Sequence, residues 1–289
     1  MIQVTSPLRY PGSKQRVMKL IRPYWDKVKH NTYEYREPFL GGASIFLNLT
    51  TQGKKVWLND KDSNIATLFS VIRDQPDELC SMIEDVQPTI ELWEKIRFSS
   101  PEDDIEIAFR TLFLNRTNYS GILSAAPIGG FRQESEYPIH CRWNGQELIK
   151  RIKLCSTELK DVRITSDDFM FPIVAPSRGN VFLMIDPPYY IKGNQLYDEG
   201  MTIEDHIRLR DLLATTKHRF LLTYDNCPEI RNLYGNMPGV HFFNTGWAYS
   251  AGTVQSKEKR KQGKELFITN IEEISESLDG MQFEQVTLS

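Results

Sequence analysis

The sequence has no long apolar run and few cysteines and histidines. Its longest strand-like apolar run is Val181 to Ile185, too short to cross a bilayer, and no basic region followed by an apolar core stands at its start. We therefore expect a soluble, cytoplasmic protein with no membrane partner. An apolar share of 40% over 289 residues is enough for the core of one large α/β domain, with or without an insertion.

The four cysteines are scattered without a C-x-x-C pair, and the five histidines form no H-E-x-x-H pair. This pattern predicts reduced thiols and no metal site. The sequence also lacks the G-x-G-x-x-G fingerprint that would cradle a pyrophosphate. Its absence disfavours a dinucleotide cofactor, and with it an oxidoreductase of the Rossmann type.

The formal net charge of −3 argues mildly against a nucleic-acid-binding protein, since such proteins are often basic. The distribution of the charges changes this interpretation. Residues 74–106 hold eleven acidic and two basic side chains, whereas residues 110–153 hold seven basic and three acidic ones. The second region could attract the phosphates of a nucleic acid while the first repels them.

Strand-like and helix-like segments alternate in the first quarter and in the second half of the chain. The expected strands are Tyr33 to Glu37, Val56 to Leu58, Val162 to Thr165, Val181 to Ile185 and Phe220 to Thr223. The expected helices are Ala43 to Leu49, the segment from the cap Asp62-Ser63 to Arg73, and Ile203 to Thr216. This alternation predicts an α/β fold with a mostly parallel, doubly wound sheet.

The middle of the chain breaks the alternation with amphipathic helical stretches and a segment, Gly121 to Trp143, that is punctuated by glycine and proline. We interpret residues 74–160 as an inserted, mostly helical domain, and residues 1–73 and 161–289 as the main domain. The basic run Ser256 to Lys264 has low complexity, which is typical of a solvated loop.

Asp186-Pro187-Pro188-Tyr189 directly follows the strand Val181 to Ile185, so it should lie at the carboxyl end of that strand, where open α/β sheets place their active sites. The Asp186 carboxylate and the Pro187 carbonyl could accept both N–H bonds of an amine and stabilise positive charge on its nitrogen. The prolines hold these acceptors rigidly, and Tyr189 can stack on a base. The alternative is a simple strand-ending turn, because Asp-Pro pairs are common.

A second candidate element is Glu37-Pro38-Phe39-Leu40-Gly41-Gly42, which follows the first strand. Glycine at this turn lets a bound cofactor approach the backbone closely. Asp60 ends the next strand, at the place where an acidic residue bonds ribose hydroxyls in nucleotide-binding β-α-β units. The alternative for Asp60 is a helix-entry cap.

Taken in order, these motifs resemble those of the Dam-type adenine-N6 DNA methyltransferases of the D12 class, group alpha. The matching segments are Pro7 to Lys14 for the N-terminal cofactor motif, Glu37 to Gly42 for the glycine-rich loop, Asn59-Asp60 for the acidic strand end and Asp186 to Tyr189 for the catalytic tetrapeptide. The resemblance implies a Rossmann-like methyltransferase sheet that uses S-adenosyl-L-methionine, with residues 74–160 as the target-recognition domain. It also implies site-specific methylation of double-stranded DNA, with the target adenine flipped out of the duplex.

The resemblance implies roles for individual residues. Tyr10 would pack on the cofactor adenine, Lys14 would line the methionine side of the pocket, and Asp168 would contact the cofactor adenine. The expected cofactor-binding residues are Tyr10, Lys14, Glu37, Pro38, Phe39, Gly41, Asp60, Asp168 and Asp186. The expected catalytic residues are Asp186, Pro187, Pro188 and Tyr189.

Phe113 to Gly121 resembles the start of the family's recognition segment, and Gly129 to Asn144 has the character of a DNA-contacting hairpin. The expected DNA-binding residues are Arg116, Asn118, Tyr119, Arg132, Gln133, Arg142 and Asn144. The sequence departs from the best-known members between Ile122 and Gly130, so no target site is predicted. The basic run Lys257 to Lys264, if it meets DNA, would contact only phosphates.

Two alternatives remain open at this point. Cytosine N4 is a similar amine, and closely related tetrapeptides act on it. A catalytically silent, sequence-specific DNA-binding regulator could keep the same fold. A restriction endonuclease acting on the same site is a further possible partner, in a bacterium, an archaeon or a phage-infected host.

Overall fold

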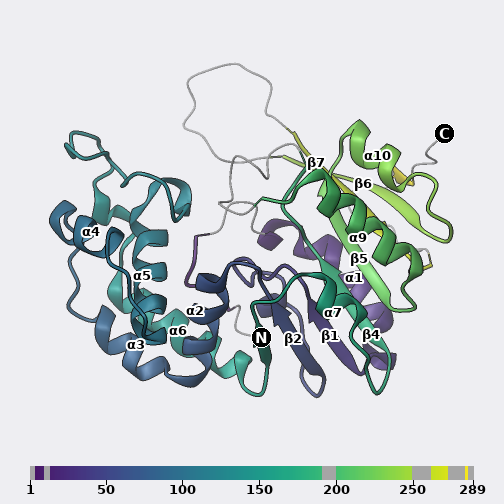
Figure 1. Ribbon diagram of the computed structural model, residues 1–289, viewed down its shortest axis with the longest axis horizontal. Helices are drawn as coiled ribbons and strands as arrows, with labels where there is room; N and C mark the ends of the chain where they lie inside the picture. The colour runs from purple at the N-terminus through teal and green to yellow at the C-terminus, as the bar shows by residue number, and fades with distance from the viewer. Residues whose placement is uncertain (1–3, 10–13, 191–199, 249–261, 273–283, 286–289) are drawn as a thin grey trace.

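The computed structural model describes residues 4–9, 14–190, 200–248, 262–272 and 284–285 of the chain. Its centre is an eight-stranded sheet in the order β3-β2-β1-β4-β5-β7-β6-β8 (Figure 1). The strands are β1 Glu34–Glu37, β2 Lys55–Asn59, β3 Arg163–Thr165, β4 Val181–Ile185, β5 Arg219–Asp225, β6 His241–Ala248, β7 Gln262–Thr269 and β8 Glu284–Gln285. The first five of these strands are parallel, and β7 runs antiparallel between β5 and β6. The predicted mostly parallel sheet is confirmed.

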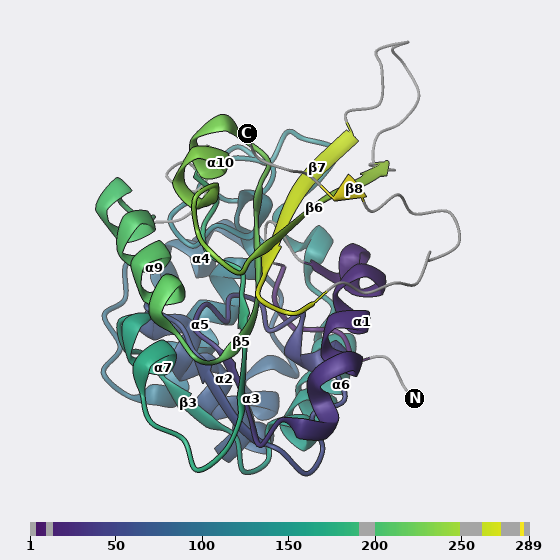
Figure 2. The ribbon, with the colours of Figure 1, turned by 90° about the vertical axis from the view of Figure 1, so that its right-hand side faces the viewer.

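Helices cover both faces of the sheet, as the doubly wound arrangement requires (Figure 2). The helices α1 Met18–Val28 and α2 Ser63–Asp74 share one apolar cluster with Phe182 and Met184 of β4. The helices α7 Met170–Val174, α9 Ile203–Thr215 and α10 Pro228–Tyr234 share another with the alternate residues Leu183 and Ile185. Successive side chains of a strand point to opposite faces, so β4 is apolar throughout because both of its faces are buried.

The order of the strands creates a crevice between β1 and β4. From β1 the chain continues outward to β2, whereas from β4 it continues outward in the other direction to β5, so that neighbouring strands β1 and β4 mark the switch point of the sheet. Open α/β sheets bind ligands outside the carboxyl ends of the strands at such a point. The segment after Glu37 and the tetrapeptide that begins at Asp186 therefore leave the sheet side by side.

Residues 74–160 form the helices α3 Pro76–Ile83, α4 Ile90–Arg97, α5 Asp104–Thr117 and α6 Gly145–Leu159, which make the separate lobe on the left of Figure 1. A small cluster around Trp93, Phe113 and Ile139 is local to this lobe. Leu112 of α5 and Ile152 of α6, however, belong to the same apolar cluster as α2. The lobe thus packs directly on the sheet domain through α2, and its boundary as a domain stays a prediction.

Two expected elements differ from the structure. The helix predicted over Ala43 to Leu49 is reduced to the 3-10 turn η3 Phe46–Asn48, because Ala43 has a φ of 56° and a left-handed residue cannot begin a right-handed helix. The hairpin predicted from Gly129 to Asn144 contains no ladder in the described chain. The segment forms turns and the 3-10 helix η5 Ile139–Arg142, and an isolated bridge joins Asn118 to Pro127 just before it.

The helix α1 and the strands β6 and β7 were not predicted from the sequence. The strand β7 begins at Gln262, within the basic run. Lys264 therefore lies in a strand, although the sequence predicted a loop. Within the described ranges, no helix is both long and apolar enough to cross a membrane.

Candidate active site

Asp186 leaves the end of β4 with its carboxylate held by two donors. The hydroxyl of Thr223, on the neighbouring strand β5, donates to Oδ1 of Asp186 at 2.6 Å. The Nζ of Lys14 lies 2.7 Å from the same oxygen. Both of these donors reach Oδ1, and Asp186 is 21% exposed, so the carboxylate combines a fixed orientation with access to a substrate.

Lys14 opens the 3-10 turn η1 Lys14–Val17, which leads into α1. Its side chain is buried, and its Nζ donates to the hydroxyl of Tyr189 at 2.8 Å and lies 4.6 Å from the centre of the Tyr189 ring. Burial alone would lower the pKa of Lys14, but the carboxylates of Asp186 and Glu265 raise it above its ordinary value. These two carboxylates therefore favour the charged form of Lys14 inside the site.

Glu265 of β7 is the part of the site that sequence reasoning missed. It is 5% exposed, its Oε1 lies 3.4 Å from Nζ of Lys14, and the hydroxyl of Tyr189 donates to the same oxygen. Burial raises the pKa of Glu265, the charge of Asp186 adds to this shift, and Lys14 opposes it. The available signal in the sequence was a lone carboxylate directly before the apolar run Leu266 to Ile268.

The carboxylates of Asp186 and Glu265 and the Tyr189 hydroxyl thus surround the Lys14 ammonium, and they come from distant parts of the chain. Lys14 brings one positive charge against the two negative charges of Asp186 and Glu265 when both are ionised. Such a site favours a substrate that carries, or develops, positive charge.

The turn after β1 is tied to the end of β2. The backbone N–H of Gly41, a residue with a φ of 49°, donates to Oδ2 of Asp60 at 2.7 Å. The N–H of Asp62 donates to Oδ1 of Asp60 at 3.0 Å. Asp60 therefore has a structural role in this turn. A carboxylate can accept about four hydrogen bonds in all, so this role is compatible with binding a ligand as well.

Asn59 joins three loops of the site from a fully buried position, and no pattern in the sequence singled out its side chain. Its Nδ2 donates to the carbonyls of Pro38 and Asp167, both at 3.0 Å. Its Oδ1 accepts from the hydroxyl of Thr165 at 2.7 Å and from the N–H of Asp167 at 2.9 Å. The segments after β1, β2 and β3 are thereby held in one arrangement.

Glu37 ends β1 with a buried side chain that accepts a hydrogen bond from the hydroxyl of Tyr35. Burial raises the pKa of Glu37 to about 8, and the nearby charge of Asp186 contributes to the shift, although the hydrogen bond from Tyr35 opposes it. Glu37 is accordingly protonated at neutral pH in the folded chain.

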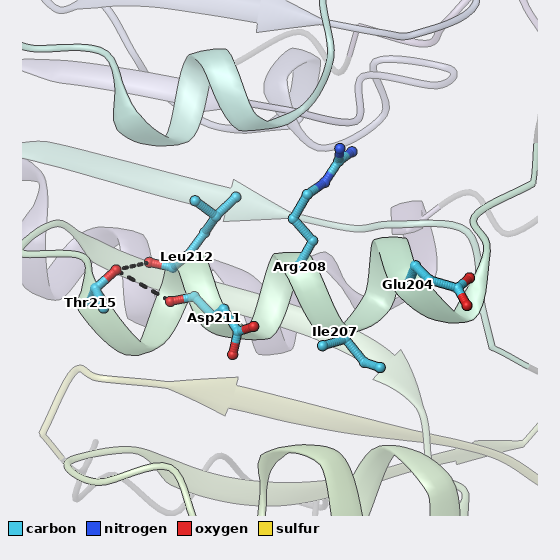
Figure 3. A pocket seen from close by; sticks show the side chains of 6 residues that line it. All are labelled: Glu204, Ile207, Arg208, Asp211, Leu212 and Thr215. Atoms are coloured by element: carbon cyan, nitrogen blue, oxygen red, sulfur yellow. Dashed lines mark hydrogen bonds between the residues drawn. The ribbon is translucent and has the colours of Figure 1, made fainter.

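Asp168 lies beyond β3, beside the aromatic pair Phe39 and Phe169, whose rings stack at 5.3 Å. Nη2 of Arg208 lies 2.6 Å from Oδ2 of Asp168, and its guanidinium lies 4.5 Å from the centre of the Phe169 ring. Arg208 also lines a hollow on α9 together with Glu204, Ile207, Asp211, Leu212 and Thr215 (Figure 3). The lining of that hollow comes from α9 alone, so we do not assign it to the reaction.

The structure brings most of the predicted cofactor and catalytic residues to the carboxyl ends of β1, β2, β3 and β4. These residues are Lys14, Glu37, Pro38, Phe39, Gly41, Asp60, Asp168, Asp186, Pro187, Pro188 and Tyr189. Tyr10 and residues 257–261 of the basic run lie outside the described residues.

The predicted DNA-binding residues separate into three groups. Arg116 is buried and donates from Nε to the carbonyl of Pro7 at 2.6 Å. Asn118 is fully buried, accepts from Nε1 of Trp93 at 2.6 Å and donates to the carbonyls of Ile122 and Leu123. Contrary to the expectation from the sequence, neither side chain is presented on the surface of the lobe: Asn118 binds partners within the lobe, and Arg116 ties the lobe to the N-terminal segment.

Two more of these residues have local partners. Oδ1 of Asn144 caps α6 by accepting from the N–H of Glu147 at 3.0 Å. Nε2 of Gln133 donates to the carbonyl of Ile128 at 2.8 Å, and its Oε1 accepts from the N–H of Ile139 at 2.7 Å. Gln133 thus fixes the turn that carries its neighbours Phe131 and Arg132.

The third group consists of Tyr119, Arg132 and Arg142, which are exposed, as Asn144 also is; Phe131, next to Arg132 in the chain, is 59% exposed. The ring of Phe131 packs edge-on against Trp93 at 5.7 Å, which steadies an aromatic side chain at the surface. Arg9 adds positive charge nearby: burial lowers its pKa and the charge of Arg142 lowers it further. Cationic and aromatic side chains therefore gather on the lobe.

The D12 class of N6 adenine-specific DNA methyltransferases has a family model that matches residues 10–250 of the chain. The chain is 23% identical over 231 residues to the Type II methyltransferase M.CviBI of Paramecium bursaria Chlorella virus NC1A, covering 78% of this chain and 85% of that protein. It is 24% identical over 242 residues to the Type II methyltransferase M1.LlaDCHI of Lactococcus lactis subsp. cremoris, covering 78% and 83%. It is 24% identical over 208 residues to the Type II methyltransferase M.MjaIII of Methanocaldococcus jannaschii, covering 65% and 70%.

Proposed function

Because the chain belongs to the D12 class of N6 adenine-specific DNA methyltransferases, we propose that its reaction centre is the crevice between β1 and β4, with Asp186 as the group that activates the target amine. The observation that carries this proposal is the Asp186 carboxylate at the switch point of the sheet, oriented through Oδ1 by Thr223 and Lys14. The family decides between the two amines considered above in favour of adenine N6.

Adenine N6 is a weak nucleophile, since its lone pair is delocalised into the ring. Oδ2 of Asp186 and the carbonyl of Pro187 accept hydrogen bonds from the two N–H groups of the amine. These hydrogen bonds draw the amine nitrogen toward tetrahedral geometry. The positive charge that develops on nitrogen is then stabilised by a carboxylate whose position is fixed beforehand. Pro187 and Pro188 restrict the backbone that carries both acceptors.

The residues present fit S-adenosyl-L-methionine as the methyl donor. The Asp60 carboxylate can accept hydrogen bonds from ribose hydroxyls. The half-buried Phe39 ring, which stacks on Phe169, offers an apolar surface for adenine, and Asp168 offers a partly exposed carboxylate to its amino group. When bound, this group supplies a methyl on a positively charged sulfur. Lys14 and Glu37 border the same site in this proposal, and the role predicted for Tyr10 falls outside the described residues.

The target adenine reaches Asp186 only after extrusion from the duplex, which costs a few kcal/mol of stacking and pairing. Tyr189, next to the acceptors, stacks on the extruded base and offsets part of this cost. Residues 74–160 contact the DNA target as the recognition domain. Of the residues considered, the exposed Tyr119, Arg132 and Arg142 are the ones that reach the bases.

The relatives named above are Type II methyltransferases, and this supports a cognate restriction endonuclease as a functional partner. The endonuclease would cut the same site when it is unmethylated.

The test is a methylation assay with duplex DNA and methyl-labelled S-adenosylmethionine, followed by digestion to nucleosides and mass spectrometry. We expect N6-methyladenine from the wild-type chain. Asp186→Asn, which keeps the shape of the side chain but removes its charge, should lose on the order of 10²-fold or more in turnover, with cofactor binding still measurable by calorimetry. Wild-type turnover in this variant would refute the assignment, and cofactor and DNA binding without turnover in the wild type would instead support a silent regulator.

A further inference from the structure

We infer that Glu265 is a positioning residue for methyl transfer, because it holds the Tyr189 hydroxyl and takes up part of the charge of Lys14, so that Asp186 keeps its acceptor strength. This inference rests on the proposed function. Glu265 acts through Lys14 and Tyr189 and is not itself assigned a contact with the substrate.

The placement of Glu265 in the sheet is the first argument. In β7 it pairs with Asp225 of β5 on one side and with Thr245 of β6 on the other, so it occupies an interior strand. Phe267, two residues along, belongs to the apolar cluster of α1, so Glu265 points to the same side of the sheet, where Lys14 enters from η1. A carboxylate in such a position is costly unless it is paired and hydrogen-bonded.

The distances are the second argument. Nζ of Lys14 lies 2.7 Å from Oδ1 of Asp186, 2.8 Å from the Tyr189 hydroxyl and 3.4 Å from Oε1 of Glu265. The ammonium is thus shared between two carboxylates. If Glu265 were neutral, Lys14 would pair with Asp186 alone and weaken the carboxylate as an acceptor for the target amine.

The Tyr189 hydroxyl links the two halves of this arrangement. It accepts from Lys14 and donates to Glu265, so the direction of its hydrogen bond is fixed. Because the phenol is held at its far end, the ring beside the target base has one orientation. In the same way, the Thr223 hydroxyl of β5 fixes the orientation of the Asp186 carboxylate by donating to it.

The experiment compares Glu265→Gln with the wild type in steady-state methylation and in cofactor binding. Glutamine keeps the size of the side chain and an oxygen for the Tyr189 hydroxyl but removes the charge. We expect kcat to fall on the order of 10-fold, within the range of coupling found inside one hydrogen-bond network, with little change in the KM for S-adenosylmethionine. Glu229→Gln removes an exposed carboxylate from α10 of the same domain and should leave kcat unchanged.

A double-mutant cycle with Tyr189→Phe separates positioning from a general structural role. If Glu265 acts through the Tyr189 hydroxyl and Lys14, the effects of the two substitutions on kcat are not additive. If Glu265 has only a structural role, its substitution lowers the melting temperature and leaves kcat unchanged. Wild-type kcat in Glu265→Gln, or strictly additive effects, overturns the inference. If Glu265→Gln does not fold, Glu265→Asp takes its place, since its carboxylate is one methylene too short to keep both partners, and full turnover there overturns the inference equally. Failure of the wild type to methylate adenine would instead refute the proposed function.

Discussion

Nζ of Lys14 and Oδ1 of Asp186 lie 2.7 Å apart, which joins the first helical turn of the chain to the carboxyl end of the central strand β4. Lys14 is buried, whereas Asp186 is partly open to solvent. The ion pair therefore has two functions. It secures the N-terminal segment over the sheet, and it fixes the carboxylate that we assign to the target amine.

Lys14→Met tests both functions. Removal of one partner of a buried ion pair costs roughly 3–5 kcal/mol, because the remaining charges lose their compensation. Asp186 and Glu265 would then lose the cation that they share, so we expect a lower melting temperature. Methylation should also fall strongly. Lys19→Met, an exposed position in α1, is the control, and an equal loss of stability there would remove the ion pair as the cause.

Asp60→Ala should raise the KM for S-adenosylmethionine and leave DNA affinity almost unchanged. The carboxylate accepts from the N–H groups of Gly41 and Asp62, so its loss loosens the turn as well as removing the partner proposed for the ribose. Asp60→Asn keeps one acceptor oxygen and should give an intermediate KM. Cofactor titration by calorimetry decides the question: unchanged affinity in both variants would reduce Asp60 to a cap of the turn.

Glu37→Gln should change how stability depends on pH. The pKa of Glu37 is about 8 in the folded chain and near its ordinary 4.5 in the unfolded chain, so unfolding releases a proton between these values. The free energy of unfolding that this group contributes therefore falls as the pH rises through that window and is constant above it. The melting temperature of the variant relative to the wild type should rise between about pH 5 and pH 8.5.

Glu34→Gln is the matched control on the same strand. Burial acts to raise the pKa of Glu34, but its hydrogen bond with Arg36 and the charge of Arg36 lower it overall, so Glu34 is ionised in both states over this range. Its substitution should cost a constant amount of stability between about pH 6 and pH 8.5. If the difference in melting temperature between Glu37→Gln and the wild type were equally independent of pH, Glu37 would be ionised in the folded chain.

The sequence predicted the parallel part of the sheet well because local signals there are strong. Val181 to Ile185 is β4 with the same bounds, since an apolar run buried on both faces ends at Asp186-Pro187. Asp62 caps α2 by accepting from the N–H of Asn64 at 2.9 Å, as its place before an amphipathic stretch indicated. These elements depend on residues close together in the sequence.

The elements that were missed depend on partners that are far away. Pro23 stands inside α1 and hides that helix from a pattern search, and β6 and β7 are stabilised by pairing with each other and with β5. Glu265 became meaningful only when this antiparallel pairing placed it beside Lys14 and Tyr189. Likewise, the motif around Arg116 and Asn118 does not by itself indicate that these side chains are buried in the lobe, because their burial depends on distant packing partners.

The exposed arginines of the lobe lead to a prediction about target choice. Arg132 follows Phe131 in a turn that Gln133 fixes through hydrogen bonds with Ile128 and Ile139. The backbone that carries the Arg132 guanidinium therefore has a defined conformation. An arginine that reads a base edge contributes about 1–3 kcal/mol at that position. Arg132→Ala should therefore weaken binding to the cognate duplex by this amount, relax one position of the site and leave thermal stability unchanged.

Two further variants separate recognition from folding and from general attraction to DNA. Arg116→Ala should lower the melting temperature and leave the ratio of cognate to scrambled binding unchanged, because its guanidinium is buried against the carbonyl of Pro7. A triple alanine variant of Lys259, Arg260 and Lys261 should weaken all sequences alike and flatten the salt dependence by about one unit of slope for each phosphate that is no longer neutralised. Salt titrations of binding to cognate and scrambled duplexes measure all three variants. If the triple variant changes the cognate ratio and Arg132→Ala leaves it untouched, the recognition surface lies on the basic run and not on the lobe.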